Sequence, residues 1–185
     1  MHLTRHPINR ITSWKSRALE EWRYSSAARG FWATMYEGSP PHIGLADYAK
    51  QEFGLDPNDN NTIAFICAVI DVAAETSGIG GEYLAVPMER LVCDPQYFIW
   101  FLKKITSPDL PLGKNYIDKV YSKGKLNPSR NIASLPFMEF GTWRSWERAV
   151  FKEACTRWPI VQSFGPLGYD FSFLADNYAI PSALT

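Results

Sequence analysis

The residues best suited to chemistry lie in and around the segment ETSGIGGEY, which covers residues 75–83. Glu75 closes a long apolar run, and Asp71 stands four positions before it, so a helix over this run would carry both carboxylates on one face. Burial and the negative end of a helix dipole both favour a protonated carboxyl group, the form that a general acid needs near neutral pH. Glu75 is therefore the candidate general acid. The nearby candidates for a second carboxylate are Asp71, Glu82 and Glu89.

The same segment resembles the catalytic glutamate region of lysozyme-like and chitinase-type glycosidases. The likeness consists of an acid at a helix end followed by Thr or Ser and then Gly, as in Glu75, Thr76, Ser77 and Gly78. The resemblance implies a glycan-cleaving hydrolase with Glu75 as general acid. Trp and Tyr are abundant and could stack on sugar rings, although aromatic residues at helical spacing more often pack in a core.

The glycines of this segment allow two further interpretations. A dinucleotide-binding fingerprint needs glycine at its first, third and sixth positions; Gly78 and Gly80 fit, but Tyr83 occupies the sixth position. A phosphate-binding loop would end in Gly-Lys-Ser or Gly-Lys-Thr, which the segment lacks. A structural role is favoured, in which Gly78 is the left-handed residue just past a helix and Gly80 and Gly81 turn the chain toward the next helix.

No other group of residues in the sequence indicates catalysis or metal binding. All three histidines lie in the first quarter of the chain, and the sequence has neither a G-x-S-x-G motif nor a Cys-x-x-Cys pair. Cys67, Cys93 and Cys155 are far apart and each lies within an apolar run, so we expect free, buried thiols. We expect no cofactor and no metal ion.

Charge is segmented along the chain, although 19 basic residues balance 19 acidic ones. Residues 1–30 carry six Lys or Arg against two acids, and residues 31–100 carry two against ten. Residues 101–160 carry eleven against five, and residues 161–185 carry none against two. Such blocks indicate either an internally matched fold or opposite faces offered to different partners.

Basic residues near aromatic ones form the candidate interaction surfaces. Such residues can follow phosphates and stack on bases, which would suit a nucleic-acid-contacting component. A protein-docking face is favoured instead, because the net charge is zero and no nucleic-acid-binding module is recognisable. The candidates come from the N-terminus, from a loop over residues 114–130 and from a late helix: Arg10, Trp14, Arg17, Trp22, Lys114, Lys119, Lys123, Lys125, Arg130, Arg144, Arg148 and Lys152.

The hydrophobic pattern predicts a mostly α protein. We expect helices over residues 13–26, 45–54, 62–76, 87–93, 94–105 and 142–158. Thr12 or Ser13 would cap the first of them, which carries Trp14, Ala18 and Trp22 in one apolar stripe, and Gly54 would end the second. Asp94 would cap the helix over 94–105, with Pro95 at its first position. The last helix would carry Trp143, Trp146, Val150 and Ala154 on one face. The fold class is an irregular orthogonal bundle of about six helices with long Pro-rich loops. Residues 1–185 form a single domain, with an N-terminal arm over 1–12 and an extended aromatic C-terminal arm over 160–185.

The longest apolar run, TIAFICAVIDVAA, predicts no transmembrane helix. It is interrupted by Asp71 and is shorter than the ~20 residues that a bilayer requires. The N-terminus is rich in Arg, His and Ser and has no acid before Glu20, which is the composition of a mitochondrial presequence. A basic first helix of the folded protein is the favoured alternative. We expect an intracellular protein, with a mitochondrial location left open by this composition.

These observations favour a non-catalytic structural or accessory subunit that docks into a larger protein assembly. Segmented charge and a surplus of Trp and Tyr, which often anchor interfaces, support this function. The expected partners are other protein subunits, with nucleic acid or peripheral membrane contact as alternatives. The alternative functions are a glycan-cleaving hydrolase that uses Glu75, and a nucleic-acid-contacting component that uses the basic N-terminus and residues 114–130.

Overall fold

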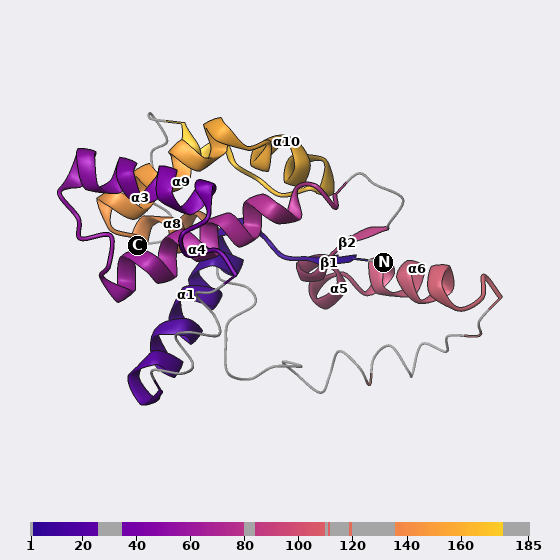
Figure 1. Cartoon of the computed structure of the whole chain (residues 1–185). Coiled ribbons are helices and arrows are strands. Elements are labelled where there is room, and N and C mark those ends of the chain that lie inside the picture. The colour runs from indigo at the N-terminus through magenta and orange to yellow at the C-terminus, as the bar shows by residue number, and fades with distance from the viewer. Residues whose placement is uncertain are drawn as a thin grey trace. The chain divides into compact units, whose positions relative to one another are not determined.

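The structure, a computed structural model, describes residues 2–25, 35–79, 84–109, 111, 119 and 136–175 (Figure 1). These residues contain eight α-helices, two short strands and two turns of 3₁₀ helix, which confirms the mostly α class. None of the helices in the described ranges is both long and apolar enough to cross a bilayer. The orthogonal packing and the Pro-rich loops stay predictions.

The chain divides into two compact units, and each is described by itself. Unit 1 comprises Met1–Arg5 and Leu84–Ser134, and unit 2 comprises His6–Tyr83 and Leu135–Thr185. The single domain expected over 1–185 stays a prediction. The described elements of unit 2 are α1 (Pro7–Tyr24), α3 (Pro40–Phe53), α4 (Asn60–Glu75), α8 (Pro136–Thr142), α9 (Ser145–Arg157), α10 (Ile160–Phe164), η1 (Gly165–Leu167) and η2 (Ser172–Leu174).

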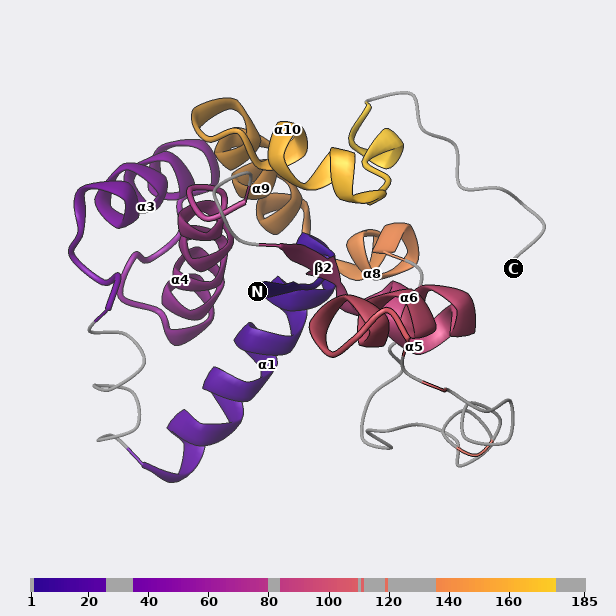
Figure 2. The same cartoon turned by 90° about the vertical axis from the view of Figure 1, so that its right-hand side faces the viewer.

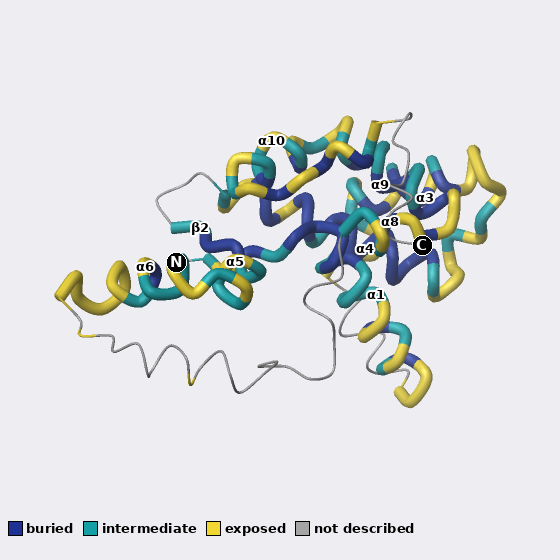
Figure 3. The backbone as a smooth tube through the Cα atoms, turned by 180° about the vertical axis from the view of Figure 1, so that it is seen from behind, coloured by how far each residue is buried: buried dark blue, intermediate teal, exposed yellow. Residues whose placement is uncertain are grey.

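Helix α4 forms the centre of unit 2. Its N-terminus is capped by Asp59, whose side chain accepts a hydrogen bond from the Thr62 amide. Nearly every residue from Thr62 to Glu75 is buried, and the helix packs against α1, α3 and α9 (Figures 2 and 3). The Phe65 ring meets the rings of Trp143 and Trp146 edge to face. The apolar sequence of α4 is thus explained by contact on several sides, as the hydrophobic pattern predicts.

Helix α1 begins earlier than predicted. Its first residue is Pro7, and the His6 imidazole caps it by accepting a hydrogen bond from the Ile8 amide at 3.2 Å. Neither Thr12 nor Ser13 is the cap, and the part of the expected 1–12 arm from Pro7 onward is helical. Proline suits the first helical position because its missing N–H needs no partner there and its φ is already helical. The predicted apolar stripe is confirmed, since Ala18 and Trp22 are buried.

The predicted extended arm over 160–185 is wrong for its described part. Residues 160–175 form α10 and two 3₁₀ turns, and Ile160, Phe164, Tyr169, Phe171 and Phe173 are buried. His6, at the start of α1, holds this segment in place, because its Nε2 donates a hydrogen bond to the Asp170 carbonyl oxygen at 3.0 Å. Short turns between Pro and Gly residues bury aromatic rings without producing the long helical period that a sequence search detects. Residues 176–185 lie outside the described ranges.

Two glycine assignments have different outcomes. Gly54 ends α3 in the left-handed conformation with φ 65°, as predicted. Gly78 does not have a positive φ, so its predicted left-handed role is wrong. Instead, turns continue past α4, and the Gly78 amide donates to the Glu75 carbonyl oxygen at 2.9 Å. Gly80 and Gly81 lie outside the described residues.

The helix predicted over 142–158 is interrupted near its start. Helix α8 ends at Thr142, and α9 begins at Ser145 with Arg144 in the cap position. The Glu147 carboxylate accepts a hydrogen bond from the Arg144 amide at 2.8 Å, which satisfies a donor at the helix start. The face that carries Trp146, Val150 and Ala154 is buried, as predicted.

The described part of residues 84–109, together with the N-terminal strand, gives unit 1 a two-stranded parallel sheet and two helices. Strand β1 (His2–Thr4) pairs with β2 (Ala85–Pro87), with Leu3 opposite Val86. These three-residue strands were not predicted, because each is too short to show an alternating pattern. Helices α5 (Met88–Cys93) and α6 (Pro95–Ile105) follow, and the Asp94 side chain caps α6 as predicted by accepting from the Gln96 and Tyr97 amides.

Of the three free thiols, Cys67 is buried and Cys155 half-buried, but Cys93 on α5 is exposed, contrary to expectation.

Candidate functional site

Glu75 and Asp71 lie on one face of α4, and Arg10 of α1 binds both carboxylates. Arg10 Nε and Nη2 donate to Asp71 Oδ2 at 3.0 and 2.7 Å, and Arg10 Nη1 donates to Glu75 Oε2. The Glu75 side chain is 2% exposed and that of Asp71 is 19% exposed. The i, i+4 spacing therefore prepares a binding place for one guanidinium of the same unit.

Tyr36 completes this cluster. Its hydroxyl donates to Asp71 Oδ1 at 3.0 Å, so Asp71 accepts from both a guanidinium and a phenol. Burial raises the pKa of Tyr36 to about 12, and the adjacent Asp71 carboxylate adds to the shift. Burial alone would lower the pKa of Arg10, but the two carboxylates outweigh that effect and raise it. The cluster therefore keeps Tyr36 neutral and Arg10 charged.

This arrangement favours a structural role for Glu75. A general acid must reach the atom that it protonates, whereas the Glu75 carboxylate is buried and bound to a cation of its own chain. Of the other candidate carboxylates, Asp71 shares that cation, and Glu89 belongs to α5 of unit 1. Glu82 lies outside the described residues. A glycosidase needs two carboxyl groups that flank a substrate, and the described contacts supply instead an ion-paired joint between two helices.

A second polar joint connects α1 with the start of α9. Lys15 Nζ binds the buried Glu147 carboxylate and lies 5.9 Å from the centre of the Phe65 ring. One helical turn earlier, Thr12 Oγ1 accepts a hydrogen bond from Trp143 Nε1 at 2.9 Å. The Lys15–Glu147 ion pair and the Thr12–Trp143 hydrogen bond each join residues more than a hundred positions apart in sequence. They therefore stabilise tertiary packing rather than a single helix.

The described members of the predicted interaction set differ in exposure and in the groups that they contact. Arg10 binds Asp71 and Glu75 of its own unit. Trp22 is buried, and Trp14 is half-buried against the core. Arg17 is exposed and donates to Glu21 on its own helix at 2.8 Å.

The later predicted residues also differ in exposure. Arg144 is exposed, Arg148 is half-buried and donates to the Gly141 carbonyl oxygen, and Lys152 is half-buried. Lys119 is exposed, whereas the remaining members of the 114–130 set lie outside the described residues: Lys114, Lys123, Lys125 and Arg130.

The surface of α5 and α6 was not among the predicted sites. The Arg90 guanidinium carbon lies 4.2 Å from the centre of the Tyr97 ring, and the Tyr97 ring stacks on Trp100 at 5.0 Å with an interplanar angle of 27°. Lys103 and Lys104 are exposed nearby in the last turn of α6. We call these five residues the α6 platform. The signal in the sequence is two aromatic residues at i, i+3 followed by adjacent lysines, and the preference of a helix C-terminus for cations accounts for those lysines as well.

The part of the chain that the structure describes contains no group of three or more His, Cys, Asp or Glu side chains placed to hold a metal ion. Comparison with known proteins gives no relative: no protein-family model, curated protein or solved structure matches the chain. Function must therefore be argued from the geometry of this molecule.

Proposed function

We propose that the chain is a non-catalytic structural or accessory subunit that docks into a larger protein assembly, and that the apolar side of α6 is its docking face. The observation that carries this proposal is the incomplete burial of the apolar side chains of α6. The helix has seven large apolar or aromatic residues, all of them described, but only Phe101 is buried. A helix that is apolar on most sides normally lies inside a protein, so α6 supports an interface with a partner.

Helices α4 and α6 differ in how far their apolar side chains are buried. Both helices are rich in apolar residues, yet α4 is dark blue along nearly its whole length in Figure 3, whereas α6 is mostly teal and yellow. Phe98 and Leu102 of α6 are half-buried, and Ile105 is 49% exposed. These three side chains follow at i, i+4 and i+7 and therefore share one side of the helix. We define them as the docking face.

The proposal agrees with the state of the acidic cluster. Arg10 already binds the two carboxylates that a hydrolase would need, so this ion-paired cluster connects α1 with α4 instead. Interfaces between stable subunits are enriched in aromatic and aliphatic side chains at their centre, which is the composition of α6. Intracellular location, and a mitochondrial one in particular, stays a prediction from composition.

Cross-linking of the complex from its native source tests the proposal. Because Lys103 and Lys104 are exposed, an amine-reactive cross-linker should join them to a stoichiometric partner polypeptide. Replacing Ile105 with serine should weaken the isolated complex about tenfold or more, since burial of an isoleucine side chain contributes about 1.5–3 kcal/mol. Ile43→Ser is the matched control, because Ile43 is 50% exposed on α3 of unit 2.

Two outcomes would contradict this function. The native protein would be found as a monomer, with α6 amides strongly protected from hydrogen exchange within the single chain. Alternatively, Ile105→Ser and Ile43→Ser would weaken the complex equally, which would place the docking face elsewhere.

A further inference from the structure

We propose that the α6 platform, made by Arg90, Tyr97, Trp100, Lys103 and Lys104, binds a single-stranded nucleic acid by stacking an unpaired base on Trp100. This inference goes beyond protein docking and uses a different side of α6. It rests on three features of the described residues: an aromatic ladder, the cations that border it, and the positive charge of the unit that carries it.

The ladder has a supported inner end and an exposed outer end. The Arg90 guanidinium lies on the Tyr97 ring, and the Tyr97 ring stacks on Trp100, so the orientation of Trp100 is fixed before any ligand arrives. Trp100 is 44% exposed, while Tyr97 is half-buried. A rigid, exposed indole is the geometry that base stacking requires, because every base offers a flat ring face.

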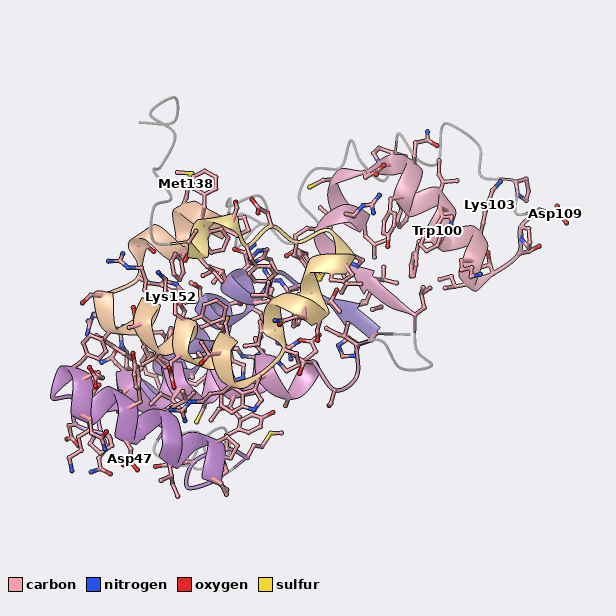
Figure 4. All side chains as sticks on the ribbon, turned by 90° about the horizontal axis from the view of Figure 1, so that it is seen from above. Asp47, Trp100, Lys103, Asp109, Met138 and Lys152 are labelled. Carbon is pink, nitrogen blue, oxygen red and sulfur yellow. The ribbon has the colours of Figure 1, made fainter. Side chains whose placement is uncertain are left out.

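The cations lie on the same side of the helix as Trp100. At 3.6 residues per turn, Tyr97, Trp100, Lys103 and Lys104 fall, together with Gln96, within an arc of about 120°. Trp100 lies near the middle of that arc, and Figure 4 shows Trp100 and Lys103 on the same stretch of α6. Ile105 of the docking face lies about 140° away. Phosphates that flank a stacked base would therefore meet a lysine on each side of the ring.

The charge of unit 1 supports an anionic ligand. Its residues carry nine Lys or Arg against four acids, whereas those of unit 2 carry ten against fifteen. The net zero charge of the chain thus conceals an excess of +5 in the unit that holds the α6 platform. Three acids lie close in sequence: Glu89 directly before Arg90, Asp94, which caps α6 and lies 3.7 Å from Arg90, and exposed Asp109 beyond the helix. Helix α6 itself contains two lysines and no acid.

Other anionic partners fit the α6 platform less well. A helix that inserts into a lipid surface places Leu, Ile or Phe beside its Trp, but the arc around Trp100 contains no aliphatic side chain. The carboxylates of an acidic protein surface would pair with Lys103 and Lys104 but offer no flat ring for Trp100. A single-stranded nucleic acid supplies the ring and the phosphates together, and its bases need not be unpaired at a cost.

Fluorescence anisotropy with the full chain tests this inference. The probes are labelled oligouridylate, labelled oligodeoxythymidylate and a labelled duplex of mixed sequence. We expect binding to the single strands in preference to the duplex, and Trp100→Ala should weaken it about 5- to 150-fold. Trp100→Phe should retain most of the affinity. Lys103→Gln/Lys104→Gln should lower the slope of log K against log salt by about 1.4, because each neutralised phosphate of a single strand contributes about 0.7.

Phe53→Ala is the matched aromatic control. Phe53 is 38% exposed and contacts the Tyr48 ring on α3, but the two rings are T-shaped and belong to the acidic unit. It should leave binding unchanged, and so should Ile105→Ser, which separates this inference from the docking proposal. The inference is overturned if the wild-type chain binds neither oligonucleotide. It is also overturned if Trp100→Ala binds as Phe53→Ala does, or if Trp100 matters only for phosphatidylserine vesicles or polyglutamate.

Discussion

Replacing Arg10 with methionine would remove the cation that Asp71 and Glu75 share while keeping most of the side-chain volume. The cost should be large, because the Glu75 side chain is only 2% exposed and its buried carboxylate would lose the guanidinium that binds it. Removing one member of a buried ion pair costs about 3–5 kcal/mol. Asp71, which is 19% exposed and also accepts from Tyr36, should contribute the smaller part of that cost.

The assay is urea denaturation followed by far-UV circular dichroism, with the midpoint and slope fitted separately. A lower midpoint with an unchanged slope reports lost stability rather than a changed unfolded state. Arg17→Met is the matched control on the same helix, since Arg17 is exposed and its pair with Glu21 should contribute only about 0.3–0.5 kcal/mol.

A second substitution identifies where the cost arises. Adding Glu75→Gln to Arg10→Met replaces the buried charge by a neutral amide and should recover about 2 kcal/mol or more. The reasoning is refuted if Arg10→Met costs less than about 1 kcal/mol, or if the double variant is no more stable than Arg10→Met alone. Either result would mean that Glu75 finds water or another donor.

The remaining predictions concern titration and thiol reactivity. Burial lowers the pKa of His42 below its ordinary value of 6.5, against a smaller opposite effect of Glu37, so the unfolded chain binds this proton first and stability should fall as pH drops below 6.5. In urea midpoints measured at several pH values, His42→Gln should lose less stability below pH 6.5 than the wild type does. An equal dependence of the midpoint on pH in both proteins would contradict the assignment to His42. Burial raises the pKa of both Cys67 and Cys155 to about 12, so a maleimide at neutral pH should label exposed Cys93 alone until the protein unfolds, as peptide mass spectrometry can show. Rapid labelling of Cys67 in the folded protein would refute its burial.

Local signals in the sequence predicted the local structure well. Asp94 before Pro95 fixes the start of α6, and Gly54 fixes the end of α3, because each depends on backbone geometry within a few residues. The apolar run of α4 also predicted burial, since a helix that is apolar on nearly every side normally lies inside a protein.

Long-range partners were not predictable in the same way. Arg10 lies 61 residues from Asp71 and 65 from Glu75, and nothing in the local pattern selects it among the basic residues of the N-terminus. The pairing of β1 with β2 likewise joins two segments that are separated in sequence by α1, α3 and α4, through three residues on each side. The sequence does predict that a cation is needed, although not which residue supplies it. Two carboxylates at i, i+4 in an apolar helix require a positive charge nearby, because burying them unpaired is costly.

The two proposed surfaces are compatible because α6 is exposed on more than one side. Phe98, Leu102 and Ile105 form the docking face, while the α6 platform around Trp100 lies about 140° from Ile105. A partner that covers one side of a helix leaves the other in water, as an amphipathic helix at an interface normally does. Protein docking and nucleic-acid binding therefore need not compete for α6. An accessory subunit of this kind would hold a strand against the assembly that it joins, which gives the basic charge of unit 1 a use that docking alone does not require.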